Sequence, residues 1–291
     1  MTTGILFALG SLFCWGFGDF FIQKSARHIG VWRTLFFIGL TGAIILLPFV
    51  EKELPGLLFN LKSLLILGLV VVVSFLAALF DFEALKEGKI AIVEPIVGLE
   101  LPIAVGLSVA FWGEQLDLLH WIFIVLIFLG VTLSITIHHS HLHYHKRIFE
   151  RGAVFAGLAA VCMALTDFTV GVSSQSISPL VTVWVMHTLL GLFAFIYLLV
   201  RGWAYQLIND LEHDLKTIIA VSLFDNFAWI FFALATVRIP ISIATTISQS
   251  YIALAVILGL FVNREKLKPH QVLGVVLAVL GIIALSLVTA G

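Results

Sequence analysis

Long apolar runs, separated by short polar connections, follow one another from the beginning of this chain to its end. A helix that spans a membrane needs roughly 20 mostly apolar residues. Read on that length, the sequence predicts ten spans, with short loops that leave no room for a soluble domain. The spans cover about 4–22, 31–50, 63–82, 90–112, 118–137, 153–172, 179–200, 216–236, 241–262 and 270–289. We therefore expect an all-α integral membrane protein.

The second half of the chain repeats the first at a nearly constant distance. Matching residues lie 148 positions apart in the opening spans and 151 positions apart in the later ones. The pairs include Gly4 with Gly152, Cys14 with Cys162, Asp19 with Asp167, Glu114 with Glu265 and Gly130 with Gly281. Such an offset indicates an internal duplication. We expect a first five-helix repeat at 1–137, a His-rich connecting loop at 138–152 and a second five-helix repeat at 153–291.

An odd number of spans in each repeat has a topological consequence. The second copy begins on the opposite side of the membrane from the first, so the two copies run in opposite directions. Inverted repeats are typical of transporters, whose substrate sites lie near the membrane midplane between the copies. The sequence thus predicts ten transmembrane helices arranged as two inverted five-helix repeats.

The composition of the chain agrees with a membrane protein and argues against a protein that binds nucleic acid. Hydrophobic residues make up 61% of the chain and charged residues 11%, against about 45–50% and about 25% in soluble domains. A net charge of −1 offers no basic face for a nucleic acid. The expected partners are therefore membrane lipid and a small-molecule substrate, with the protein a monomer or homodimer.

The distribution of basic residues predicts an orientation. Of the 16 lysines and arginines, 13 fall in or beside the connections that follow the odd-numbered spans. Cytoplasmic loops carry the excess of positive charge in membrane proteins. We expect a multi-pass protein of the cell membrane (plasma or inner), with its termini outside and its central loop in the cytoplasm.

Short motifs in a fixed order carry a resemblance over essentially the whole chain. They are Trp15-Gly16, Arg33, Ala84-Leu85, Pro95, Glu114 and Gly130 in the first half, and Ala235, Pro240, Ser242, Glu265 and Gly281 in the second. In this order, and duplicated, they resemble the drug/metabolite transporter superfamily, EamA type. The resemblance implies a ten-helix carrier of small metabolites or drugs, with a central cavity lined by helices 1, 3, 4, 6, 8 and 9. It does not identify the cargo, and Asp19 occupies a position where a neutral residue is frequent.

Carboxylates inside the predicted spans are the first candidates for a site. An Asp at the centre of a span costs roughly 2.5–3.5 kcal/mol on insertion scales, so it normally faces a cavity or a partner. Asp19 and Asp167 lie late in spans 1 and 6 and should point toward opposite faces of the membrane, while Glu94 and Glu100 lie in span 4. We interpret all four as parts of a substrate or proton pathway. The alternatives are solvation at a helix end and a protonated Glu bonded to a carbonyl.

The second half adds polar and aromatic candidates. Asp225 and Asn226 lie in the middle of span 8, and Gln249 and Tyr251 belong to a dense polar run in span 9. Serines and threonines in such a run also bond back to their own helix. The aromatic candidates for stacking on a flat or cationic cargo are Trp15 and Trp229.

Other polar residues have a structural interpretation. Glu114 and Glu265 fit an architectural role in binding loop amides, His187 that of a packed, hydrogen-bonded histidine, and Asp81 that of an interfacial charge beside lysines. The weak metal-ligand candidates in the connecting loop are His139, His141 and His143. Composition alone also allows a solvated linker there.

Catalytic and phosphate-binding motifs are missing from the sequence, so we expect neither an enzyme nor a cofactor. The leading hypothesis is a secondary-active carrier of a small cationic or zwitterionic metabolite, amino-acid or drug-like. It is proton-coupled and works by alternating access. One alternative is a divalent-metal carrier that uses the intramembrane acids and the His-rich loop. The alternative of another class is a membrane-embedded enzyme or scaffold.

Overall fold

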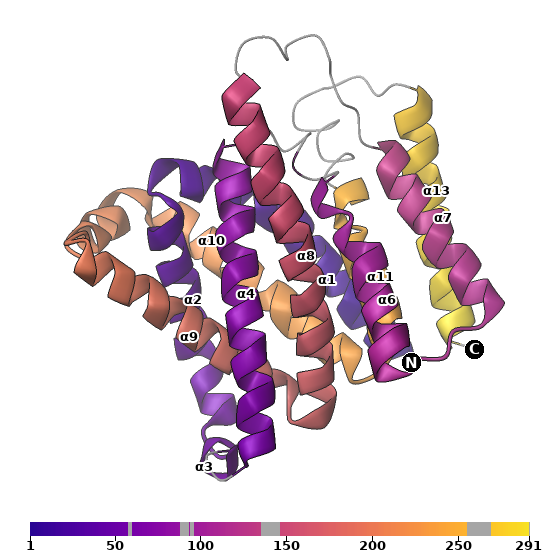
Figure 1. The fold of residues 1–291 in the computed structure, drawn as a ribbon, viewed down its shortest axis with the longest axis horizontal. Coiled ribbons are helices and arrows are strands. Elements are labelled where there is room, and N and C mark those ends of the chain that lie inside the picture. The colour runs from indigo at the N-terminus through magenta and orange to yellow at the C-terminus, as the bar shows by residue number, and fades with distance from the viewer. Residues whose placement is uncertain (58–59, 88–92, 94–95, 135–145, 255–268, 291) are drawn as a thin grey trace.

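The computed structural model of this chain describes residues 1–57, 60–87, 93, 96–134, 146–254 and 269–290 (Figure 1). Over these ranges every regular element is a helix. The helices are α1 (Thr2–His28), α2 (Val31–Val50), α3 (Leu54–Leu57), α4 (Leu61–Glu87), α6 (Glu100–Trp112), α7 (Leu118–Ser134), α8 (Lys146–Ser176), α9 (Pro179–Val200), α10 (Gln206–Thr236), α11 (Ile241–Gln249) and α13 (Pro269–Ala290). The all-α prediction is confirmed for this part of the chain.

Each predicted span overlaps one apolar helix. Seven of the described helices are long and apolar enough to cross a membrane, and three shorter ones are also apolar. The shorter ones are α6, α7 and the helical segment Ile241–Leu254. Spans 4, 5 and 9 extend into residues outside the described ranges, so the structure describes these three only in part.

One predicted boundary is wrong by ten residues. The expected connection 201–215 is largely helical, because α10 already begins at Gln206. The apolar segment does not include the polar turn that contains Asp210 and Asp214. Ion pairs nevertheless hold that turn of helix against the neighbouring helices. The helix therefore extends beyond the apolar segment that predicted it.

Helices of the two halves pack against each other in matching pairs. The principal contacts are α1 with α10, α4 with α8, α2 with α9, α6 with α11 and α7 with α13. Each pair takes one helix from each half, and the α1–α10 pair is the repeat image of α8–α4. In Figure 1 both termini lie at one end of the bundle, where α1 begins, whereas α8 begins at the other end. The two halves therefore run in opposite directions.

A polar contact recurs at the repeat offset. The hydroxyls of Ser25 and Thr34 lie 2.8 Å apart, and those of Ser173 and Thr182, exactly 148 positions later, also lie 2.8 Å apart. Both pairs are buried and join the first helix of a repeat to its second. The duplication thus preserves side-chain contacts as well as helix positions.

The α7–α13 contact shows the same symmetry. A Cβ added to Gly130 would lie 2.6 Å from the backbone nitrogen of Ala278, and one added to Gly281 would lie 2.7 Å from the side chain of Ile127. Gly130 and Gly281 are 151 positions apart, and so are Ile127 and Ala278, the residues that they approach. Small residues at such crossings let helix backbones approach closely.

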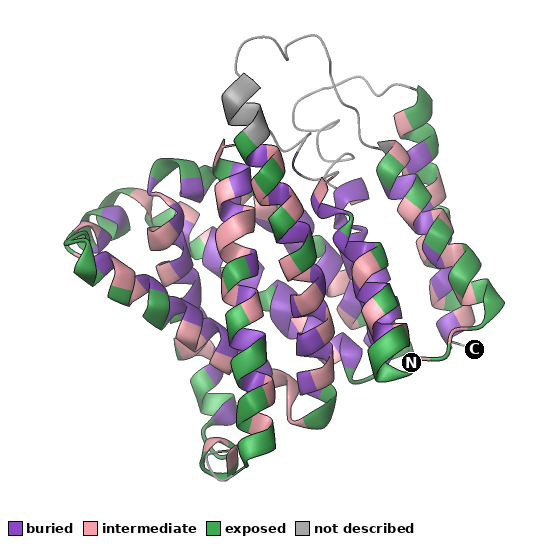
Figure 2. Cartoon of the chain, in the orientation of Figure 1, coloured by how far each residue is buried: buried purple, intermediate pink, exposed green. Residues whose placement is uncertain are grey.

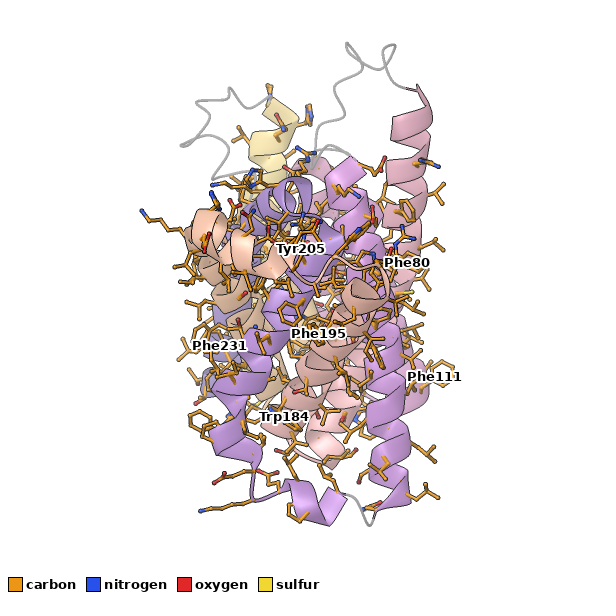
Figure 3. All side chains as sticks on the ribbon, turned by 90° about the vertical axis from the view of Figure 1, so that its left-hand side faces the viewer. Phe80, Phe111, Trp184, Phe195, Tyr205 and Phe231 are labelled. Carbon is orange, nitrogen blue, oxygen red and sulfur yellow. The ribbon has the colours of Figure 1, made fainter. Side chains whose placement is uncertain are left out.

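The outer surface of the bundle is apolar. Exposed residues line the outward sides of the helices in Figure 2, and Phe111 projects from the outside of the bundle in Figure 3. On α13 the exposed residues include Val272, Leu280 and Leu287. Large exposed apolar side chains on several neighbouring helices fit contact with lipid rather than with water.

Predicted spans 4 and 9 are interrupted at equivalent positions, just before α6 begins and just after α11 ends. The amide of Leu99 donates to the carbonyl of Ile96, and the amide of Ser250 donates to that of Ile247, each at 3.2 Å. Both bonds span three residues instead of four, and the two sites are 151 positions apart. Irregular backbone at membrane depth is tolerated where it is buried in protein or lines a cavity.

Candidate functional site

A cavity lies between the two halves, beside both helix interruptions. Its empty volume, open mouth included, is about 710 Å³. The lining comes from α1, α4, α6, α8, α10 and α11, and also from α2 and α9. The first six of these helices correspond to predicted spans 1, 3, 4, 6, 8 and 9, which the family resemblance implied as the cavity lining. Val97 and Glu100 flank one interruption and Gln249 and Tyr251 the other, and all four line the cavity.

Four acidic side chains from four helices line the cavity. They are Asp19 of α1, Asp81 of α4, Glu100 of α6 and Asp225 of α10. The described lining contains His187 but no lysine or arginine. Glu100 is only 2% exposed. Several carboxylates gathered around one cavity attract cations or protons.

His187 and Asp225 form a buried pair in this lining. The Nε2 atom of His187 lies 3.1 Å from Oδ2 of Asp225, and its Nδ1 atom lies 3.0 Å from the carbonyl oxygen of Val183. The two side chains are 2% and 10% exposed. The pair joins α9 to α10, and both side chains line the cavity.

The repeat-related aspartates occupy different environments. Asp19 lines the cavity directly. Asp167 is fully buried and accepts a hydrogen bond of 2.9 Å from Nε2 of Gln249, which itself lines the cavity. The repeat equivalent of Gln249 is Gly98, which has no side chain. Because α1 and α8 run in opposite directions, the two aspartates lie toward opposite ends of the bundle.

Aromatic residues form one wall of the cavity. The ring centroids of Trp15 and Trp229 are 5.2 Å apart with planes at 85°, and Tyr251 lies 6.3 Å from Trp15. All three line the cavity. The tryptophans therefore pack against each other and also face the cavity.

Asn226, predicted to belong to the pathway, does not line the cavity. Its Nδ2 atom donates to the carbonyl oxygens of Ile38, at 3.0 Å, and Ser222, at 2.8 Å. The first of these bonds ties α10 to α2. The geometry gives Asn226 a role in holding the turn that carries Asp225.

Glu114 joins the two halves at the end of the bundle that holds the termini. Its carboxylate accepts hydrogen bonds from the amides of Ile241 and Ser242 and from the Ser242 hydroxyl. These amides begin α11, where unpaired donors and the helix dipole favour an anion. The contact matches the architectural role predicted for Glu114; its counterpart Glu265 lies outside the described residues.

Glu114→Gln is expected to lower the free energy of unfolding by about 1–3 kcal/mol, the range for losing hydrogen bonds to a charged acceptor. Thermal unfolding in detergent would measure the change. The matched control is Glu53→Gln, which alters an exposed residue. Equal unfolding temperatures for the two variants would contradict the proposed capping role.

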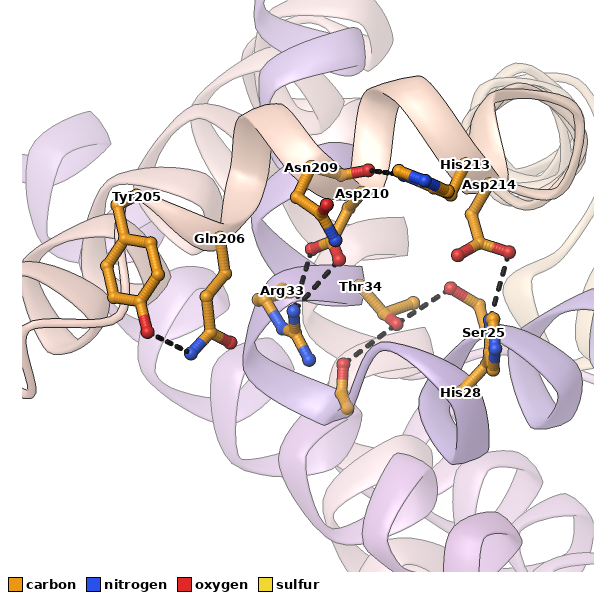
Figure 4. A network of polar contacts seen from close by, with 11 residues as sticks. Ser25, His28, Arg33, Thr34, Tyr205, Gln206, Asn209, Asp210, His213 and Asp214 are labelled. Carbon is orange, nitrogen blue, oxygen red and sulfur yellow. Dashed lines mark hydrogen bonds and ion pairs between the residues drawn. The ribbon is translucent and has the colours of Figure 1, made fainter.

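A second polar cluster ties α1 and α2 to α10 at the other end (Figure 4). The Nη1 atom of Arg33 lies 2.8 Å and 3.1 Å from the two carboxylate oxygens of Asp210, and Nδ1 of His28 lies 2.9 Å from Oδ1 of Asp214. Arg33 is thus paired at the helix end rather than placed in the cavity. The cluster holds the start of α10 in place.

Sequence reasoning missed two ionisable residues of the lining, His187 and Asp81. His187 finds its partner 38 residues away, a separation that no local motif reveals. Asp81 lies among charges near the end of α4, which favoured an interfacial interpretation. The signal for both was a polar residue inside an apolar span.

Several predicted positions lie outside the described residues. They are Glu94, His139, His141 and His143. Within the described ranges, no three histidines, cysteines or acids come close enough to hold a metal ion.

Comparisons with known proteins agree with this architecture. The EamA-like transporter family matches residues 2–136 and 150–287, two segments that correspond to the two repeats. A solved crystal structure of a protein shares the fold, with a TM-score of 0.74 over 100% of this chain and 98% of that chain, at 12% identity.

Two curated archaeal relatives match about one repeat each. An uncharacterized transporter of Archaeoglobus fulgidus is 27% identical over 128 residues, which are 44% of this chain and 46% of that protein. The chain thus spans about half the length of that relative. An uncharacterized protein of Methanocaldococcus jannaschii is 29% identical over 133 residues, 46% of this chain and 96% of that protein.

Proposed function

The chain belongs to the EamA-like transporter family, and we propose that it is a secondary-active, proton-coupled carrier of a small cationic or zwitterionic metabolite. That it is a multi-pass membrane transporter and not an enzyme follows from the family and the apolar helices. The class of cargo and the coupling are the proposal.

The observation that carries the proposal is the charge of the cavity. Asp19, Asp81, Glu100 and Asp225 face one space that receives no lysine or arginine from the described residues. An anionic cargo would meet repulsion there, whereas an ammonium or guanidinium group would find acceptors. The aromatic wall of Trp15, Trp229 and Tyr251 adds faces on which a cation or a flat ring can lie.

Alternating access is supported by contacts of similar kind at both ends of the bundle. At one end Nε of Arg27 donates to the carbonyl of Lys86 at 3.3 Å, and at the other Nε2 of Gln175 donates to the carbonyl of Thr236 at 2.6 Å. Arg27 and Gln175 are repeat equivalents. We propose that contacts at one end open while those at the other stay closed. In the orientation we propose, the termini are outside and the central loop is cytoplasmic.

The cargo class can be tested with proteoliposomes. We expect putrescine, lysine or phenylalanine to be accumulated under an imposed pH gradient, and glutarate, an anion of similar size, not to be. Gradients of both signs should be applied, since the direction of transport is open. Accumulation of glutarate in preference to all three amines would contradict the proposal. A thermal-shift screen of amino acids, polyamines, nucleosides and metals would widen the set of compounds.

A further inference from the structure

We propose that His187 and Asp225 share one proton and form a proton-binding site of this carrier. The inference rests on the proposed function for its role in transport. The shared proton itself is inferred from the geometry of the pair alone.

The ring orientation fixes the state of one nitrogen. Nδ1 of His187 lies 3.0 Å from the carbonyl oxygen of Val183. A carbonyl oxygen only accepts hydrogen bonds, so Nδ1 carries a hydrogen. A neutral imidazole has one hydrogen on its two nitrogens, and this contact uses it.

The other nitrogen then requires an additional proton. Nε2 lies 3.1 Å from Oδ2 of Asp225. A lone pair on Nε2 and a carboxylate oxygen would repel each other, so a proton lies between them. The pair is either an imidazolium with a carboxylate or a neutral imidazole that accepts from a carboxylic acid. In both forms it holds one proton and has no net charge.

The surroundings favour this neutral state. Besides the pair itself, the charged or titratable groups that face the same cavity are Asp19 from α1, Asp81 from α4, Glu100 from α6 and Tyr251 just after α11, and none of them is a base. From α2, α8 and α11 the described lining is Leu35, Ile38, Met163 and Gln249. A net negative charge on a pair this buried would be costly without a compensating cation.

A coupling step follows from the same geometry. When the proton leaves for water in the cavity, a neutral His187 with a lone pair on Nε2 faces an ionised Asp225. The carboxylate must then turn toward another donor, and an ammonium or guanidinium group of the cargo supplies one. Proton and cation therefore compete for Asp225, which exchanges one positive charge for another.

Nuclear magnetic resonance of ¹⁵N-histidine-labelled protein in lipid bilayers tests the shared proton. His187→Gln assigns the signals of this residue among those of the other histidines. Spectra are recorded across pH 5–9, and we expect them to show Nδ1 protonated and Nε2 either carrying or accepting the shared proton. Infrared spectra of the same samples, with Asp225→Asn as reference, show whether Asp225 holds the proton as an acid.

Each outcome decides the question. A proton on Nε2 or on Asp225 at low pH supports the pair, whichever atom holds it. An unprotonated Nδ1, or a neutral His187 beside an ionised Asp225 at every pH, overturns it. Neither the resonance spectra nor the infrared spectra depend on transport. If none of the tested cargo compounds were transported, only the proposed function would be contradicted.

Transport then tests the role of the pair. For any compound that wild-type protein accumulates under a pH gradient, Asp225→Asn and His187→Gln should reduce the ratio of driven to undriven uptake to about one. The control is His213→Gln, at an exposed histidine of α10. Driven uptake that persists in Asp225→Asn would overturn the coupling role even if the shared proton were observed.

Discussion

Glu100→Gln is expected to abolish accumulation of cargo under a pH gradient, while exchange of cargo between the two sides of the membrane persists. The side chain lies at the start of α6, directly after the interruption at Leu99, and faces the cavity. Glutamine has nearly the same shape and still forms hydrogen bonds, but it neither takes up nor releases a proton. The accumulation ratio should therefore fall to about one.

Proteoliposomes preloaded with unlabelled cargo distinguish exchange from driven uptake. The matched control is Glu83→Gln, at a glutamate outside the cavity lining that pairs with Lys86 across 3.2 Å. Gradient-driven accumulation at wild-type rates in Glu100→Gln would remove Glu100 from the coupling mechanism. The resonances of His187 should be unchanged in this variant, which separates the two proton-binding positions experimentally.

Gly39→Ala is expected to destabilise the protein strongly, because it places a methyl group inside the crossing of α2 and α9. The added Cβ would lie 2.4 Å from the backbone nitrogen of Gly191 and 2.6 Å from the carbonyl oxygen of His187. Backbone atoms cannot move aside as a flexible side chain does. We expect a cost of about 3 kcal/mol or more, the upper part of the range for overpacking.

The control for this variant is Gly68→Ala on α4. A Cβ at Gly68 would meet nothing within 4 Å, and alanine is the better helix former by about 1 kcal/mol. The two substitutions should therefore change the thermal unfolding temperature in opposite directions. A stabilised Gly39→Ala protein would show that the α2–α9 crossing is wider than described.

The sequence predicted the parts of the molecule that repeat over many residues. Apolar runs of span length located the helices, and the constant offset revealed the inverted halves. Intramembrane acids pointed to Asp19, Glu100 and Asp225, which the fold brings to one cavity. The apolar runs and the offset recur along the chain, and the acids are costly to place in lipid. Each of these features can therefore be recognised without a structure.

Contacts between distant residues could not be predicted in the same way. Asp225 was identified, but not its pairing with His187, because helix packing and not sequence spacing brings α9 and α10 together. Asn226 looked equivalent to its neighbour, yet consecutive residues of a helix point about 100° apart, and Asn226 donates to the carbonyl of Ile38. The early start of α10 depended on Arg33, 177 residues away from Asp210.

The asymmetry between Gln249 and Gly98 bears on which way an idle carrier faces. In a perfectly two-fold protein, the inward-facing and outward-facing forms would have equal free energy and equal populations. Gln249 donates a hydrogen bond to Asp167, whereas its repeat equivalent Gly98 has no side chain that could donate one. A net contribution of about 1 kcal/mol, typical of one hydrogen bond, shifts such a balance roughly fivefold. Once two half-length copies are joined in one chain, each can change alone, and a single amide is enough to give the empty carrier a preferred side.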